Sequence, residues 1–190
     1  SFFSFLFVNR HLSILLKFIR CVYPEVSIFP LCYNKTMSKD MVTIGVDSST
    51  TNCGIAVFRN GDLITTCNLE FSGRYDLDKL ELIIQRFDEL FKEHKPHMVI
   101  LEQPAPVRNS RTLTALNQVA GAIWATAAMH GAFIDHMHNK IIKKIMEVKS
   151  KQDAIDRVKE KYGVVVETDH EADAILTVEA YRIHMSEKAS

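Results

Sequence analysis

The stretch MVTIGVDSSTTNCGIAVFRNGDLITTCNLEF, residues 41–71, decides the fold, because it predicts three β-strands in succession. A short apolar run rich in β-branched residues leads to Asp47, the turn formers SSTTN follow, and CGIAVFRN is a second apolar run. Asn60-Gly61 is typical of a two-residue hairpin, so LITTCNLEF predicts the third strand. We therefore expect the domain to open with an antiparallel meander.

Helices and strands alternate after this meander. Asp76 can cap a helix that ends before Pro96, and its apolar residues recur at the three- and four-residue spacing of one buried stripe. These residues are Leu80, Ile83, Ile84, Phe87, Leu90 and Phe91. HMVILE, residues 97–102, then predicts a fourth, buried strand.

The rest of the chain continues the alternation. Residues 112–131 predict a second helix and residues 131–138 a fifth strand. Ser150 can cap a third helix that runs through Lys161, and the last helix should start near Thr168. This order predicts one α/β domain without repeats.

Length and composition fit this single domain. The chain has 190 residues, 47% of them hydrophobic, which is enough for one buried core but not for a second full domain. The first 36 residues differ from the rest, with aromatic clusters and Glu25 as their one acid. We expect residues 1–36 to be an extraneous or disordered extension, either a targeting segment or the product of a reading frame begun upstream of Met37. Residues 37–190 then form the functional domain.

Charge and cysteine content limit which binding partners and which cellular compartment we expect for this protein. Lysine plus arginine equals aspartate plus glutamate at 23 each, so any nucleic-acid binding must come from local clusters of charge. The four cysteines show no C-x-x-C spacing, which argues against structural zinc and is typical of a reducing compartment. Charged residues interrupt the N-terminal apolar runs before they reach the roughly 18 to 20 residues of a bilayer span. We expect a cytoplasmic protein without a membrane span.

Two carboxylates end predicted buried strands. Asp47 follows TIGV and Glu102 follows MVIL, and these two runs should lie side by side in the interior of the sheet. A charge at such a place costs several kcal/mol of desolvation unless a cation or a partner offsets it. Each residue alone is also compatible with simple solvation at the end of a strand. Together they indicate either a metal site or a salt bridge.

A third element favours the metal site. In TDHEADAIL, His170 and Asp173 are three residues apart and lie on one helical face, while neighbouring apolar residues press that helix onto the sheet. Mg²⁺ and Mn²⁺ prefer oxygen ligands, and nucleases that use two such ions need three or four acids or a histidine. Asp169 and Glu171 are better explained as first-turn acids that complement the helix dipole.

The three blocks IGVDSSTTNCGIAVF, VILEQP and HEADAILTVEAY resemble, in order and spacing, the catalytic blocks of the RuvC-like Holliday-junction resolvases. The likeness covers about residues 41–184 and implies a ribonuclease-H-like fold with a mixed five-stranded sheet flanked by helices. It implies that Asp47, Glu102, His170 and Asp173 are the catalytic and metal-binding residues.

The same resemblance implies an activity and its partners. These are structure-selective endonuclease activity on branched DNA, two Mg²⁺ ions for which Mn²⁺ can substitute, and a homodimer built with the long helix that follows Glu102. The segment after Glu102 departs from the family, because Pro104, Ala105, Pro106 and Val107 stand where members often carry an aromatic residue.

Phosphate contacts require cations. The densest supply follows the fifth strand, and two arginines follow Glu102 closely. The predicted DNA-binding residues are Arg108, Arg111, Lys140, Lys143, Lys144, Lys149 and Lys151. Each of these lysines is also compatible with an ordinary solvated surface.

Three other interpretations stay open at this point. The first is a catalytically silent nucleic-acid-binding protein of the same fold. The second is an actin-like or sugar-kinase-type ATP-binding domain, because GVDSSTTNCGIAV also resembles their phosphate-binding hairpin, although those proteins need two such domains. The third is a related nuclease that processes structured RNA, which presents the same phosphates as DNA.

Overall fold

The structure is a computed structural model in which Ser38–Ser190 form one compact unit. It describes residues 40–104 and 107–189. The prediction that residues 1–36 are an extraneous extension therefore lies outside the described residues.

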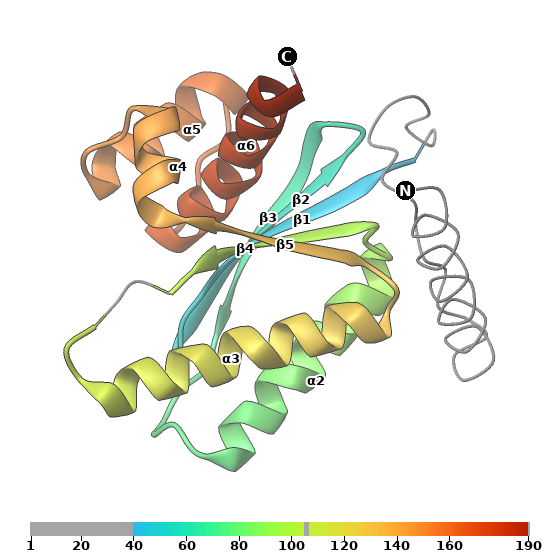
Figure 1. Cartoon of the computed structure of the whole chain (residues 1–190), viewed down its shortest axis with the longest axis vertical. Coiled ribbons are helices and arrows are strands. Elements are labelled where there is room, and N and C mark those ends of the chain that lie inside the picture. The colour runs from blue at the N-terminus through green and yellow to red at the C-terminus, as the bar shows by residue number, and fades with distance from the viewer. Residues whose placement is uncertain (1–39, 105–106, 190) are drawn as a thin grey trace, which may run out of the picture. The chain divides into compact units, whose positions relative to one another are not determined.

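A mixed five-stranded sheet forms the centre of the domain (Figure 1). Its strand order is β3-β2-β1-β4-β5, with β1, β2 and β3 antiparallel and with β4 parallel to both β1 and β5. The predicted meander and the mixed sheet are both confirmed. The strands are β1 (Val42–Ser48), β2 (Asn52–Arg59), β3 (Asp62–Glu70), β4 (Met98–Gln103) and β5 (Phe133–His138).

Helices cover both faces of this sheet, with α2 and α3 on one side and α4, α5 and α6 on the other (Figure 1). Each face therefore has its own apolar core, one beneath α2 and α3 and one beneath the C-terminal helices. Within residues 40–104 and 107–189 no helix has the length and apolar character that crossing a membrane requires. The helices are α2 (Leu77–His94), α3 (Ser110–Met129), α4 (Asn139–Met146), α5 (Lys151–Tyr162) and α6 (Asp169–Ala189).

Local capping signals agree with the observed helix starts. The Asp76 side chain accepts a hydrogen bond from the Lys79 backbone N–H at the start of α2. Ser150 begins α5 with a complete capping box, in which its side chain and that of Asp153 each bond to the other's backbone. On α2 the predicted stripe is half-buried at Leu80 and exposed at Ile84, which is 39% exposed. It is buried at the other predicted positions, Ile83, Phe87, Leu90 and Phe91.

One helix was not predicted. The segment Asn139–Met146 was interpreted only as a basic stretch after the fifth strand, but it forms α4. Its Ile142 and Met146 are four residues apart and both are buried beneath the C-terminal helices. The segment is only 8 residues long, so its short periodicity was easily hidden by the lysines between.

Two glycines allow α6 to pack closely on the sheet. A Cβ atom built at Gly45 would lie 2.3 Å from the carbonyl oxygen of Ala174, and one at Gly54 would lie 2.0 Å from that of His170. Real Cβ atoms do not approach backbone this closely, so only glycine fits at either position while α6 keeps its place. The first turns of α6 are thereby held against β1 and β2.

Candidate functional site

Asp47 and Glu102 lie next to each other at the ends of adjacent strands. Because β1 and β4 are parallel and Val46 pairs with Leu101, the next residue on each strand is one of the two acids. Val46 and Leu101 are fully buried, whereas both acids are partly exposed. The predicted neighbourhood of the two strands is confirmed.

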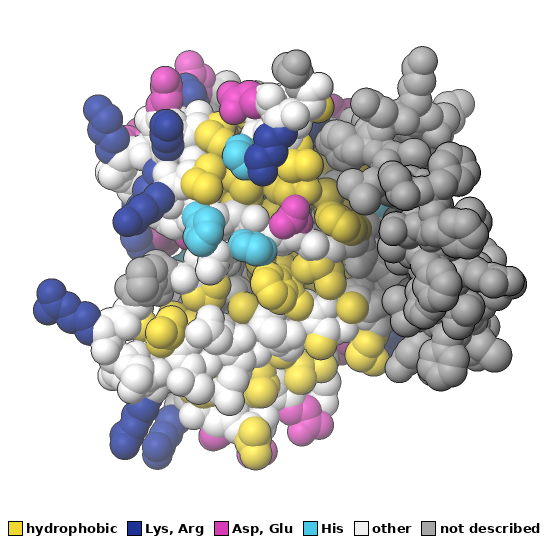
Figure 2. Space-filling view, in the orientation of Figure 1, with side chains coloured by type: hydrophobic (Ala, Val, Ile, Leu, Met, Phe, Trp, Pro, Cys, Tyr) yellow, Lys and Arg dark blue, Asp and Glu magenta, His cyan; other side chains and the backbone are white. Residues whose placement is uncertain are grey.

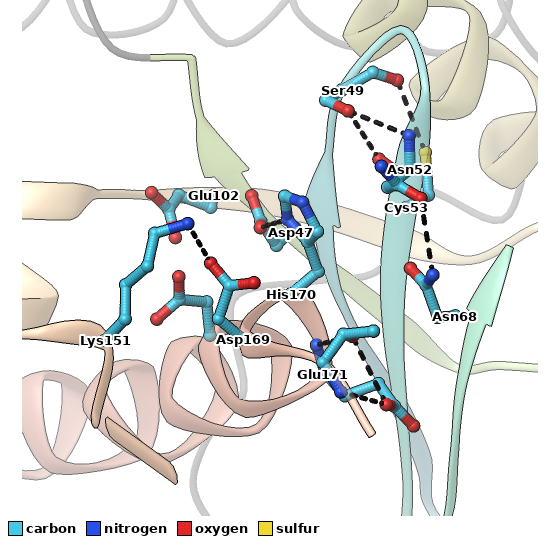
Figure 3. A network of polar contacts seen from close by, with 12 residues as sticks. Asp47, Ser49, Asn52, Cys53, Asn68, Glu102, Lys151, Asp169, His170 and Glu171 are labelled. Atoms are coloured by element: carbon cyan, nitrogen blue, oxygen red, sulfur yellow. Dashed lines mark hydrogen bonds and ion pairs between the residues drawn. The ribbon is translucent and has the colours of Figure 1, made fainter. Parts of the chain in front are cut away.

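The first turn of α6 brings His170 to the same place (Figure 3). The His170 Nδ1 atom lies 2.6 Å from Asp47 Oδ2, within hydrogen-bonding distance, although these residues are 123 positions apart. This hydrogen bond is the main reason why the pKa of His170 is raised. Asp47 pairs with Gly54 on β2, and Gly54 lies under the His170 carbonyl. The close packing of α6 on β2 therefore explains the contact between His170 and Asp47.

Glu102 has an unusual environment. Its Oε1 accepts a hydrogen bond of 2.5 Å from the Asn139 side-chain amide, at the start of α4. Its Oε2 is buried and has no hydrogen-bond partner among the described residues. Burial, and then the nearby Asp47 carboxylate, raise the pKa of Glu102 from 4.5 to about 8. A carboxylate with one oxygen held and the other unsatisfied is a candidate cation ligand.

Asp173 lies one turn beyond His170 on α6 and belongs to the same electrostatic group. Burial, then the charges of Asp47 and Asp169, raise its pKa to about 6. Its charge in turn contributes to the raised pKa of Glu102. Glu102 and Asp173, whose pKa values the Asp47 carboxylate helps to raise, form with it a centre where a cation would relieve the repulsion.

The other two acids of this turn have structural roles. Glu171 is buried, and its Oε2 accepts hydrogen bonds from the backbone N–H groups of Glu167 and Thr168. The Thr168 hydroxyl accepts from the Glu171 backbone N–H, which completes a capping box at the start of α6. Asp169 forms an ion pair with Lys151, which lowers the pKa of Asp169 (Figure 3).

The predicted cations divide into two groups. The positive charge of Lys143 opposes the rise in the pKa of both Glu102 and Asp173, which indicates that Lys143 lies near these acids. Lys151 reaches the edge of the site through its ion pair with Asp169. The others are exposed on α4, after it, just before α3 or in its first turn, and Lys and Arg side chains stand out along the left side of Figure 2. These exposed residues are Arg108, Arg111, Lys140, Lys144 and Lys149.

The donor set fits a divalent cation in its chemistry, although it is not arranged as a closed cage. Across residues 40–104 and 107–189, no three His, Cys, Asp or Glu side chains are gathered as metal ligands. The unsatisfied Glu102 Oε2 and the raised pKa values of Glu102 and Asp173 are what a site for a hard cation provides.

Residues outside the sequence prediction complete the site. Asn139 contacts Glu102 directly, and Gly54 determines how closely His170 approaches Asp47. An asparagine at the start of a helix is normally interpreted as a cap, so its sequence signal did not indicate the site. Gly54 lies inside an apolar strand run, where an isolated glycine is a sign of close backbone approach.

Known proteins show similarity to this chain. No family model matches it. A curated relative, the crossover junction endodeoxyribonuclease RuvC of Paenarthrobacter aurescens (strain TC1), is 32% identical over 94 residues, which are 46% of this chain and 50% of the relative. The aligned region therefore spans half the length of that curated relative.

Solved structures are similar over a larger part of the chain. T. thermophilus RuvC in complex with a Holliday junction substrate has a TM-score of 0.67 at 18% identity, covering 77% of this chain and 96% of that one. The yeast mitochondrial Holliday junction resolvase Ydc2 has a TM-score of 0.56 at 13% identity, covering 77% and 80%. The predicted ribonuclease-H-like fold and the resemblance to RuvC-like resolvases are confirmed.

Proposed function

We propose that this chain is a metal-dependent endonuclease of the RuvC type that cleaves phosphodiester bonds in branched DNA. The observation that carries the proposal is the convergence of Asp47, Glu102 and α6 at the ends of two buried strands. Partly buried acids whose pKa values are raised by burial and by neighbouring carboxylates cost stability, and a function explains why they are kept together. The similarity to two resolvase structures supports the reaction class.

Asp47, Glu102 and Asp173 would hold Mg²⁺, with Mn²⁺ as a substitute and His170 as a further candidate ligand. When bound, two such ions activate a water molecule for attack on the phosphodiester and stabilise the leaving 3′ oxygen. Glu102 would offer Oε2, because Oε1 is held by Asn139. Asp47 lies next to both Glu102 and His170, so its carboxylate would be the central ligand of the site.

His170 has a second candidate role. Its Nδ1 is within hydrogen-bonding distance of Asp47, which orients the ring and leaves Nε2 as the atom that can bind an ion or hold a proton from water. The raised pKa of His170 means that, without cations, the ring stays protonated to higher pH than usual. A bound cation next to Asp47 would favour the neutral ring.

DNA would be held by the lysines that flank these acids. Lys143 and Lys151 lie near the acids, where a phosphate next to the scissile bond would need positive charge. Lys140, Lys144 and Lys149 extend this charge along the surface after β5. A homodimer through α3, as the family resemblance implies, would place two such sites on one branched substrate.

We predict that Asp47→Asn abolishes cleavage while DNA binding is retained. The change removes the central negative charge, and cation-dependent catalysis should fall at least about a thousandfold, roughly 4 kcal/mol of transition-state stabilisation. The measurement uses labelled four-way junction, flap, duplex and RNA–DNA hybrid substrates with Mg²⁺, Mn²⁺ or chelator. The substrate that is cut in a cation-dependent manner identifies the class.

The control for this experiment is Asp88→Asn, which makes the same chemical change on α2. Asp88 is bonded to Lys92 and His130 and is not part of the acidic site. This variant should cleave as the unchanged protein does. Cleavage retained by Asp47→Asn would contradict the assignment, and binding without cleavage by the unchanged protein would favour a catalytically silent DNA-binding protein.

We also predict that Asn139→Ala weakens cation binding by about tenfold to a hundredfold, the usual effect of losing a group that orients a metal ligand. Without the amide, Glu102 loses its only hydrogen bond among the described contacts. Calorimetry with Mn²⁺ measures the affinity without any cleavage step. Asn139→Ser keeps a donor and should lose less, so equal losses in the two variants would argue against a role for the hydrogen bond.

A further inference from the structure

Lys79, in the first turn of α2, is a buried cation. Within residues 40–104 and 107–189 it is the one lysine or arginine that is buried, with 6% of its surface exposed. Its Nζ donates hydrogen bonds to the backbone carbonyl oxygens of Thr50 at 3.2 Å, Phe71 at 3.0 Å and Gly73 at 2.5 Å. An ammonium group has three donors, so backbone carbonyls use all of them.

The three carbonyls belong to two separate connections of the chain. Thr50 lies in the turn between β1 and β2, whereas Phe71 and Gly73 lie in the loop between β3 and α2. In the sheet β2 separates β1 from β3, so no strand pairing joins the end of β1 to this loop. Lys79 therefore makes that connection, together with the hydrogen bond of 2.8 Å from the Phe71 N–H to the Thr51 carbonyl.

The turn that Lys79 holds joins Asp47 to Gly54. These two residues pair across the hairpin, and the contact of Asp47 with His170 depends on how α6 packs on Gly54. Figure 3 shows Ser49 and Asn52 at the tip of the hairpin that carries Asp47.

Hydrogen bonds within the turn determine its shape. The Ser49 hydroxyl accepts from the backbone N–H groups of Thr51 at 3.2 Å and Asn52 at 2.9 Å. These bonds are local to the turn and do not determine where it lies relative to α2. Lys79 supplies that second constraint, because it reaches the turn from the helix.

Helix formation and packing do not explain why a charge is kept at this place. The start of α2 is capped by Asp76, which uses the backbone N–H of Lys79 and not its side chain. Removing an ammonium group from water is costly, and an apolar side chain of similar volume often replaces a buried charge without loss of stability. A buried charge that is retained can instead determine one conformation among several.

We propose that Lys79 is a positioning residue for the cation site: it holds the turn between β1 and β2 so that Asp47 is correctly placed as a ligand. This inference rests on the proposed function and adds to it a residue from the opposite face of the sheet. Lys79 acts through the backbone of the turn and not by contact with the cation. Metal ligands whose supporting contacts are lost bind their ion more weakly, because the ligand then samples more orientations.

Lys79→Met tests this role, because methionine has a similar length and no donor. Calorimetry of the full chain with Mn²⁺ should show an affinity about tenfold lower than that of the unchanged chain. In chelator, amide hydrogen exchange at Thr51 and Asn52 should be faster in the variant, while exchange at Ile100 in the middle of β4 stays the same. Lys79→Gln keeps two donors and should lose less affinity; it also serves as the test if Lys79→Met does not fold.

Lys92→Met is the matched control, because it makes the same change on α2 at a side chain that is 67% exposed and paired with Asp88. Its Mn²⁺ affinity and its amide exchange should equal those of the unchanged chain. Unchanged Mn²⁺ affinity in the Lys79 variants, or faster exchange that extends equally to Ile100, would overturn the role of Lys79 alone. If the unchanged chain binds no Mn²⁺, the proposed metal site is wrong and this inference falls with it.

Discussion

Glu102→Gln is expected to stabilise the metal-free protein at pH 8 and above while abolishing cleavage. In the folded chain the pKa of Glu102 is raised from 4.5 to about 8. Between these pH values Glu102 therefore keeps its proton in the folded state and loses it in the unfolded state. The stability of the unchanged protein therefore falls as pH rises through this window. Glutamine is neutral throughout and escapes this loss, which is on the order of 2 to 4 kcal/mol.

Chemical denaturation in chelator at pH 4.5, 6.5 and 8.5 measures this effect. The two proteins should be similar at pH 4.5, and the glutamine variant should be more stable at pH 8.5. Adding Mg²⁺ or Mn²⁺ should stabilise the unchanged protein most at pH 8.5, because the ionised Glu102 is then available as a ligand, and should stabilise the variant far less.

Glu89→Gln is the control for the same chemical change at the surface. Glu89 forms an exposed ion pair with Arg86, and its loss should change stability by less than about 0.5 kcal/mol at every pH. If Glu102→Gln is less stable than the unchanged protein at pH 8.5 in chelator, our inference that Glu102 is an unfavourably buried charge is wrong. If it still cleaves DNA, its assignment as a metal ligand is wrong.

Gly54→Ala is expected to destabilise the fold by roughly 2 to 4 kcal/mol and to impair the site at the same time. The new Cβ atom would meet backbone atoms of His170 at 2.0 and 2.1 Å, and backbone cannot move aside as a flexible side chain can. The first turn of α6 must shift away from β2. The hydrogen bond between His170 and Asp47 should then be lost, because it depends on that close approach.

Denaturant unfolding measures the loss of stability, and Mn²⁺ calorimetry measures the loss at the site. Gly121→Ala is the matched control, because a Cβ atom at Gly121 meets nothing within 4 Å and alanine favours the helical backbone of α3. It should stabilise the chain by about 0.5 to 1 kcal/mol. Measurements at two protein concentrations separate any contribution from self-association. If Gly54→Ala left both stability and Mn²⁺ affinity unchanged, α6 would not pack closely against this glycine.

The fold was predictable because its signals are local. The hairpin at Asn60-Gly61, the cap at Asp76 and the capping box at Ser150 each depend on residues a few positions apart, and all three appear where expected. Asp47 and Glu102 were recognisable as candidates because each follows an apolar strand run. A short element such as α4 was missed because 8 residues give too little periodicity.

By itself the sequence determined the kinds of elements, their order and the acids at the strand ends, because apolar residues recur along each element with the period of its buried positions. The tertiary structure alone decided which groups meet: Asn139 with Glu102, His170 with Asp47, Lys151 with Asp169, and the ring of His138 with that of His136. Such contacts join residues far apart in the chain or on different elements. They depend on strand order and on how closely a helix rests on the sheet, for which no local pattern carries a signal.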